Sequence, residues 1–152
     1  MLQVAVGTIG LAADHAAWDL KNALAERLSG LGWQVRDFGT HSTEACDYPD
    51  VVVPCAQALA RGELDLAVVA CGSGVGASIS ANKVRGVRAA LCLEEEQARL
   101  SRRHNNAQCL VLSSRLRSVE QNLLMLEAWL AESFEGGRHE RRIQRLHDLT
   151  HC

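Results

Sequence analysis

The chain of 152 residues has little net charge, no long hydrophobic run and few aromatic residues. Its 16 Lys and Arg residues nearly balance 18 Asp and Glu, and a net charge of -2 gives no reason to expect a nucleic-acid partner. No apolar run approaches the roughly 20 residues that a membrane-spanning helix requires, so we expect no membrane association. The apolar start, MLQVAVGTIGLAA, has no Lys or Arg, which favours a strand over a signal peptide.

The six cysteines show no C-x-x-C spacing. Disulfide frameworks are typical of small secreted chains that lack a hydrophobic core, whereas this chain is long enough to bury one. We therefore expect reduced thiols in a cytoplasmic protein, most of them serving as small buried hydrophobic residues. Four cysteines lie in or beside apolar segments: Cys55, Cys71, Cys92 and Cys109.

Short apolar segments alternate with segments of helical period along the whole chain, without a repeat or a linker. This alternation predicts one α/β domain over residues 1–152, in which helices cover both faces of a five-stranded parallel sheet. In the predicted helix 50–61, we expect Pro54 to be tolerated only in the first turn. The predicted strands are 9–13, 33–39, 64–71, 87–93 and 109–114. The other predicted helices are 17–32, a short one at 77–84, 94–104, 118–133 and a basic one from about 137.

Polar clusters follow three of the predicted strands, at ADH (13–15), CGSG (71–74) and SSR (113–115). Ligands of parallel α/β sheets bind at the carboxyl ends of the strands. We therefore expect the three clusters to lie at the binding edge.

The loop from Gly72 to Ala77 formally fits the dinucleotide pattern G-x-G-x-x-G/A, with Glu94 about 20 residues further on. The helix expected after it is short for a dinucleotide-binding unit, and the loop follows the third strand rather than the first. A P-loop is excluded because no Gly-Lys-Ser/Thr follows, and a G-x-S-x-G nucleophile elbow is excluded because position 71 is Cys. The pattern leaves three interpretations open: a dinucleotide site, a tight structural turn, and a site for a small anion.

The thiol of Cys71 would lie between a strand end and a helix N-terminus, where backbone N–H groups stabilise negative charge. Such a position can lower a thiol pKa from its usual value of about 8.5. The alternative is an inert, buried cysteine at a strand end. Ser73 adds a hydroxyl to a loop whose amides could face a developing oxyanion, which favours an active site.

Other polar residues have both a structural and a functional interpretation. Asp14 and His15 pair a carboxylate with an imidazole at the binding edge, although Asp14 also suits a helix N-cap. His104 and Asn105 end a predicted helix, where the helix dipole itself favours a cationic histidine.

The basic tail EGGRHERRIQRLHDL has arginines at helical spacing. It predicts either a solvated basic face or a clamp of Arg138 and Arg142 for phosphate or carboxylate. An H-E-x-x-H zinc motif is absent, because the fifth position after His139-Glu140 is Ile143. If the end of the chain is helical, three terminal residues could bind a metal: His147, His151 and Cys152. We expect a frayed end instead.

Together these residues resemble the ribose-5-phosphate isomerase type B family, which also includes the galactose-6-phosphate isomerase subunits. The resemblance extends from about Ile9 to Leu149 and depends on seven motifs in order. They are ADH (13–15), DYPD (47–50), CGSGVG (71–76), ANK (81–83), SRRHN (101–105), SSR (113–115) and EGGRHERR (135–142).

The resemblance implies a metal-free aldose–ketose isomerase without a cofactor, acting on ribose 5-phosphate or another phosphosugar such as allose or galactose 6-phosphate. It implies a Rossmann-like fold and a homodimer or tetramer with active sites between subunits, to which the basic helix (about 137–149) contributes. Cys71 would be the base, Ser73 would stabilise the enediolate, and Asp14 with the partner's His104 would assist ring opening. Phosphate would be held by His15, Arg115, Arg138 and Arg142, and sugar or enediolate by Tyr48, Gly72, Gly74, Gly76, Asn82 and Asn105.

Two departures from the family pattern affect this expectation. One branch of the family uses a glutamate just after the glycine loop as the base, and here that position is Ala77. Ser73 replaces the threonine of many cysteine-type members and keeps the hydroxyl. The resemblance therefore places proton transfer on Cys71, while a non-catalytic nucleotide-binding module stays as the alternative.

Overall fold

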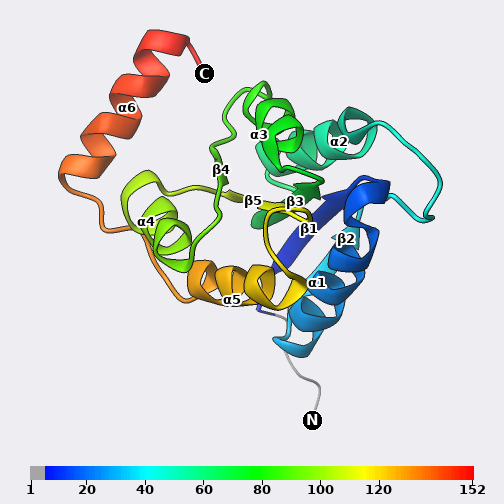
Figure 1. Cartoon of the computed structure of the whole chain (residues 1–152). Coiled ribbons are helices and arrows are strands. Elements are labelled where there is room, and N and C mark those ends of the chain that lie inside the picture. Colours follow the sequence, from blue (N-terminus) through cyan, green and yellow to red (C-terminus); the bar gives the residue numbers. More distant parts are fainter. Residues whose placement is uncertain (1–5) are drawn as a thin grey trace.

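The computed structural model describes residues 6–152, so the first five residues of the predicted N-terminal strand lie outside the described part. Five strands form one sheet in the order β2-β1-β3-β5-β4, and all four pairings are parallel (Figure 1). The predicted five-stranded parallel sheet is confirmed. The strands are β1 (Thr8–Ala13), β2 (Gln34–Asp37), β3 (Leu66–Cys71), β4 (Ala89–Leu91) and β5 (Cys109–Ser113).

Helices cover both faces of this sheet, because the side chains of its central strands alternate between two hydrophobic clusters. Val68 and Ala70 of β3 pack with α1, α4 and α5, whereas Val69 and Cys71 pack with α2 and α3. Figure 1 shows the two helical layers on opposite sides of the sheet. The helices are η1 (His15–Ala17), α1 (Trp18–Gly30), α2 (Tyr48–Ala60), α3 (Val75–Asn82), α4 (Glu95–Asn105), α5 (Val119–Leu130) and α6 (Arg138–Thr150).

Two details differ from the sequence prediction. Helix α2 begins at Tyr48, so that Pro49 occupies the first turn and Pro54 lies in the helix interior. The expectation that Pro54 belongs to the first turn is therefore wrong. Helix α6 continues to Thr150, whereas a frayed end was expected.

Helix α6 is the element that leaves the body of the domain. It packs against α4 and extends beyond the sheet in Figure 1. Its apolar side chains Leu146 and Leu149 are 49% and 63% exposed. Among residues 6–152, no helix has the length and apolar character needed to cross a membrane.

Candidate active site

Cys71 ends β3, and its side chain is buried at the entrance of the glycine loop. The loop turns into α3 at Gly74, which has φ = 79° in the left-handed region. A Cβ at position 74 would lie 2.5 Å from Leu91 Cδ1 and 3.1 Å from the carbonyl oxygen of Leu112. Glycine is therefore required here both for the backbone conformation and for the space.

The other two glycines let large side chains approach the loop. A Cβ at Gly72 would lie 3.0 Å from Cζ of Arg115, and a Cβ at Gly76 would lie 2.5 Å from Cζ of Tyr48. A guanidinium from the end of β5 and a phenol from the start of α2 therefore lie against the loop that follows Cys71.

Polar groups of the loop remain available to an anion. Ser73 Oγ accepts a hydrogen bond from the backbone N–H of Val75 at 3.2 Å, which leaves the hydroxyl proton free to donate. In the described part of the chain, the N–H groups of Gly76 and Ala77 have no hydrogen-bond acceptor. Both groups belong to the first turn of α3, where the helix dipole favours negative charge.

Asp14 and His15 follow β1 at the same edge of the sheet. Asp14 Oδ1 accepts from the N–H of Ala16 at 3.1 Å, so the N-cap interpretation of Asp14 is confirmed for η1. His15 Nδ1 accepts from the N–H of Cys46 at 3.1 Å. The neutral imidazole of His15 therefore carries its proton on Nε2, which can donate to a ligand.

Asn82 joins the end of α3 to β4. Its Nδ2 donates to the carbonyl oxygens of Ser78 (3.0 Å) and Ala89 (2.9 Å), and its Oδ1 accepts from the N–H of Ala89 (2.9 Å). These backbone contacts occupy both ends of the amide, and a contact with sugar stays a prediction.

A second group of predicted residues lies between α4 and α6. His104, Asn105 and Arg142 line one cavity of about 280 Å³, together with Arg88 and His139. Arg138, the first residue of α6, is exposed beside this group. No hydrogen bond or ion pair within residues 6–152 joins this group to the residues around Cys71.

Two residues of the second group were missed by sequence reasoning. The His139 ring stacks on His104 with a centroid distance of 4.1 Å and an interplanar angle of 9°. Glu135 Oε2 lies 3.7 Å from His104 Nε2 and 3.5 Å from His139 Nε2. Both residues belong to the motif EGGRHERR, which therefore contained a signal beyond its three arginines.

His104, Glu135 and His139 offer three potential metal ligands within 4.8 Å of one another. The lone pair of an imidazole nitrogen lies in the ring plane, so a bound metal must lie in that plane as well. Two nearly parallel rings stacked at 4.1 Å share no such position. The observed arrangement is therefore a stack and not a metal centre. His147 of the predicted terminal trio instead contacts Arg88, with 3.0 Å between Nε2 and the guanidinium.

Comparisons with known proteins agree on one family. A family model described as Ribose/Galactose Isomerase matches residues 9–146. The ribose-5-phosphate isomerase B of Escherichia coli (strain K12) is 41% identical over 136 residues, which cover 90% of this chain and 91% of that protein. The D-erythrulose-4-phosphate isomerase of Pectobacterium atrosepticum is 37% identical over 152 residues, which cover 99% of this chain and 97% of that protein.

Structural similarity is equally extensive. The crystal structure of ribose-5-phosphate isomerase B from Mycoplasma genitalium, with bound ribulose-5-phosphate, has a TM-score of 0.91 and 38% identity, and the match covers 95% of this chain and 96% of that one. The resemblance stated from the seven motifs is thus confirmed. The chain belongs to the ribose/galactose isomerase family and is an aldose–ketose isomerase.

Proposed function

We propose that this enzyme interconverts ribose 5-phosphate and ribulose 5-phosphate through an enediolate, with Cys71 as the base. The main support for this proposal is that the Cys71 thiol is buried at the entrance of the glycine loop, where the N–H groups of Gly76 and Ala77 have no acceptor among the described residues. The glutamate that serves as the alternative base in the family is missing here. Its position is occupied by Ala77, which is buried in α3 and has a methyl group that cannot accept a proton. The relatives named for ribose-5-phosphate isomerase B support this substrate.

The reaction moves one proton between neighbouring carbons. The Cys71 thiolate removes the proton from C2 of the open-chain aldose, and the electron pair moves toward the carbonyl oxygen at C1. Return of the proton to C1, with transfer of a hydroxyl proton from O2 to O1, gives the ketose. A positioned base contributes about 10² to 10⁴ in rate to such a step. No electron leaves the sugar, so the reaction requires no redox cofactor.

The negative charge of the enediolate develops on oxygen beside the glycine loop. The free N–H groups of Gly76 and Ala77 and the hydroxyl of Ser73 are suited to stabilise it. Tyr48 lies against the same loop and would contact the sugar hydroxyls. Asp14 would exchange protons with the sugar during ring opening.

The phosphate and the imidazole for ring opening require residues from both groups. His15 and Arg115 lie at the sheet edge with Cys71, whereas His104, Asn105, Arg138 and Arg142 lie at α4 and α6. We propose that each active site combines the first group of one subunit with the second group of its partner in a homodimer. The exposed apolar side chains of α6 support such an assembly.

Replacement of the base tests the mechanism. We expect Cys71→Ala to lower kcat by about 10² to 10⁴, with an unchanged circular dichroism spectrum and melting temperature. Cys152→Ala is a matched control, because Cys152 is exposed at the chain end, and its kcat should equal that of the wild type. Wild-type turnover by Cys71→Ala would disprove the mechanism.

A substrate panel tests the choice of sugar. We expect the highest kcat/KM for ribose 5-phosphate among the phosphates of ribose, allose, galactose and erythrulose. Erythrulose 4-phosphate is included because of the Pectobacterium relative. A higher kcat/KM for another sugar phosphate would be consistent with the proposed isomerase mechanism but would assign a different substrate to the enzyme. Calorimetric binding of NAD or AMP, without turnover of any phosphosugar, would instead support the nucleotide-binding alternative.

We also place this enzyme in the cytoplasm. All six cysteines have free thiols in the structure, which is the expected state in a reducing compartment.

A further inference from the structure

The stacked imidazoles lie where α6 meets α4. His104 is the last residue but one of α4, and His139 is the second residue of α6. The side chain of His139 is only 7% exposed, whereas that of His104 is 32% exposed. The rings are nearly parallel, with centroids 4.1 Å apart. One imidazole is therefore fixed by packing, and its face limits the orientations that the more exposed ring can adopt.

Glu135 faces the edges of both rings. Its Oε2 is 3.5 Å from His139 Nε2 and 3.7 Å from His104 Nε2. These distances are too long for hydrogen bonds, so the interaction is electrostatic. The other oxygen, Oε1, accepts from Arg103 at 2.7 Å (Nε) and 2.6 Å (NH2). The carboxylate is thus held in one orientation, with one oxygen facing the histidines.

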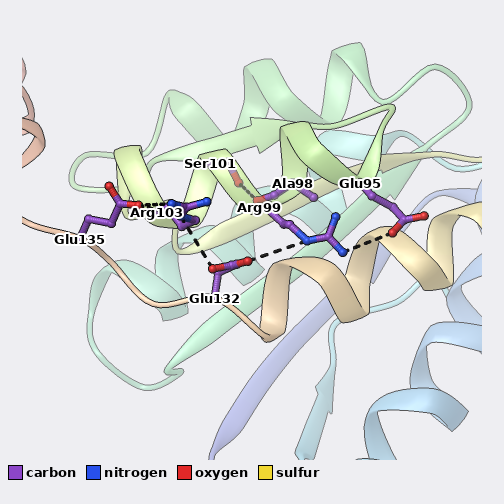
Figure 2. A network of polar contacts seen from close by, with 7 residues as sticks. All are labelled: Glu95, Ala98, Arg99, Ser101, Arg103, Glu132 and Glu135. Carbon is purple, nitrogen blue, oxygen red and sulfur yellow. Dashed lines mark hydrogen bonds and ion pairs between the residues drawn. The ribbon is translucent and has the colours of Figure 1, made fainter.

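A chain of ion pairs holds Arg103 in turn. Figure 2 shows Arg103 between Glu135 and Glu132, followed by Arg99 and Glu95. The successive distances are 3.9 Å (Arg103–Glu132), 3.8 Å (Glu132–Arg99) and 3.5 Å (Arg99–Glu95). Each pair is partly exposed, and a single pair of this kind contributes little stability. As a network they connect α4 to the segment after α5 that leads into α6.

Burial and nearby positive charges favour the neutral form of His139. Burial, followed by the positive charges of His104 and Arg138, lowers the pKa of His139. The hydrogen bond from Arg103 lowers the pKa of Glu135. At neutral pH a neutral His139 and an ionised Glu135 therefore face His104. The other charged groups near the stack are Arg142 of α6 and Arg88, which line the same cavity.

We propose that His139 is a positioning residue: its buried ring holds the imidazole of His104 in the plane required for proton transfer to the sugar, while Glu135 supplies the negative charge that this imidazole faces. The inference rests on the proposed function, in which His104 assists ring opening. In this role His139 acts through the ring of His104 and not by a direct contact with the substrate.

Two substitutions separate stacking from other effects of His139. His139→Ala removes the ring, and we expect kcat to fall about 10- to 100-fold with little change in KM, because catalytic groups that are displaced by about 1 Å lose activity on this scale. His139→Phe keeps a flat ring without nitrogen atoms, and we expect it to restore most of the lost kcat. Gln144→Ala, an exposed position on the same helix, is the control and should have wild-type kinetics.

Ring signals of His104 in NMR spectra give a readout that does not depend on activity. The His104 ring protons should lose their ring-current shift in His139→Ala and keep it in His139→Phe. Glu135→Gln should keep the stack and the ring-current shift of His104, because the ring of His139 and not the carboxylate of Glu135 holds the His104 ring in place.

The outcomes distinguish the two proposals. If His104→Ala lowers kcat but His139→Ala does not, or if His139→Phe is as impaired as His139→Ala, the positioning role is disproved and the proposed function stands. If His104→Ala has wild-type kcat, the role of His104 in the proposed function is disproved, and the positioning role with it.

Discussion

At the scale of single residues, burial divides the cysteines into groups with different chemistry. Desolvation raises the pKa of Cys55 to about 12 and that of Cys92 to about 11, and it raises the pKa of the fully buried Cys109 well above its usual value. Cys152 is exposed at the end of the chain. The expected role of most cysteines as small hydrophobic residues fits this burial.

These pKa shifts predict the order of thiol alkylation. A raised pKa keeps a thiol protonated, and only the thiolate reacts quickly with iodoacetamide. At pH 8 we expect Cys152 to be alkylated within minutes, while Cys55, Cys92 and Cys109 react only after unfolding. Mass spectrometry of peptides from native and urea-unfolded protein measures this order. Rapid labelling of Cys109 in the native protein would contradict the burial assigned to it.

At the scale of secondary-structure elements, α2 contains the clearest conflict between local sequence and observed structure. Pro54 lies six residues after the helix start at Tyr48, and its side chain is exposed. A proline in a helix interior removes a hydrogen bond and crowds the carbonyl group four residues earlier, here that of Asp50. The helix forms despite this, because Val52, Cys55, Ala56 and Leu59 pack against the sheet.

Replacement of this proline is expected to stabilise the protein. Pro54→Ala restores the N–H donor and leaves no cavity, while the more flexible unfolded chain offsets part of the gain. We expect the free energy of unfolding to rise by about 2 kcal/mol, which corresponds to roughly 5 °C in melting temperature for a chain of this size. Pro49→Ala is the matched control, because a proline in the first turn costs nothing, and it should not raise the melting temperature. An equal gain in both variants would contradict the argument.

At the scale of the whole molecule, the proposed active site requires two subunits. The residues around Cys71 and those around His104 form separate groups in one chain, and α6 packs against α4 at a distance from the glycine loop (Figure 1). A two-fold symmetric dimer would bring the two groups together twice, once at each site.

Complementation between inactive variants tests this arrangement. Each mixed dimer of Cys71→Ala and His104→Ala contains one intact site, so random exchange should restore about a quarter of the wild-type activity. The activity is measured after denaturation and refolding of equimolar mixtures. Cys71→Ala mixed with Ser73→Ala is the control, because both changes affect the same half of the site and no intact site can form. Equal activity of the two mixtures would contradict a shared site.

Local sequence patterns were sufficient to predict most of the helices and strands and the position of the binding edge. Apolar runs predicted the central strands β1, β3 and β5, since a strand buried on both faces must be apolar over its whole length. The glycine loop, Asp14 and Arg115 could be placed at one edge because parallel strands end at the same side of a sheet. These features depend on local pattern and on topology, and both are present in the chain order.

The contacts between side chains of different elements depend on tertiary packing. Three contacts join residues far apart in the sequence: Tyr48 with Gly76, His104 with His139, and Arg103 with Glu135. No local pattern specifies such a contact, because it depends on how the helices pack against one another. For the same reason the interior position of Pro54 was missed: burial of one face of α2 outweighs the local preference of proline against a helix.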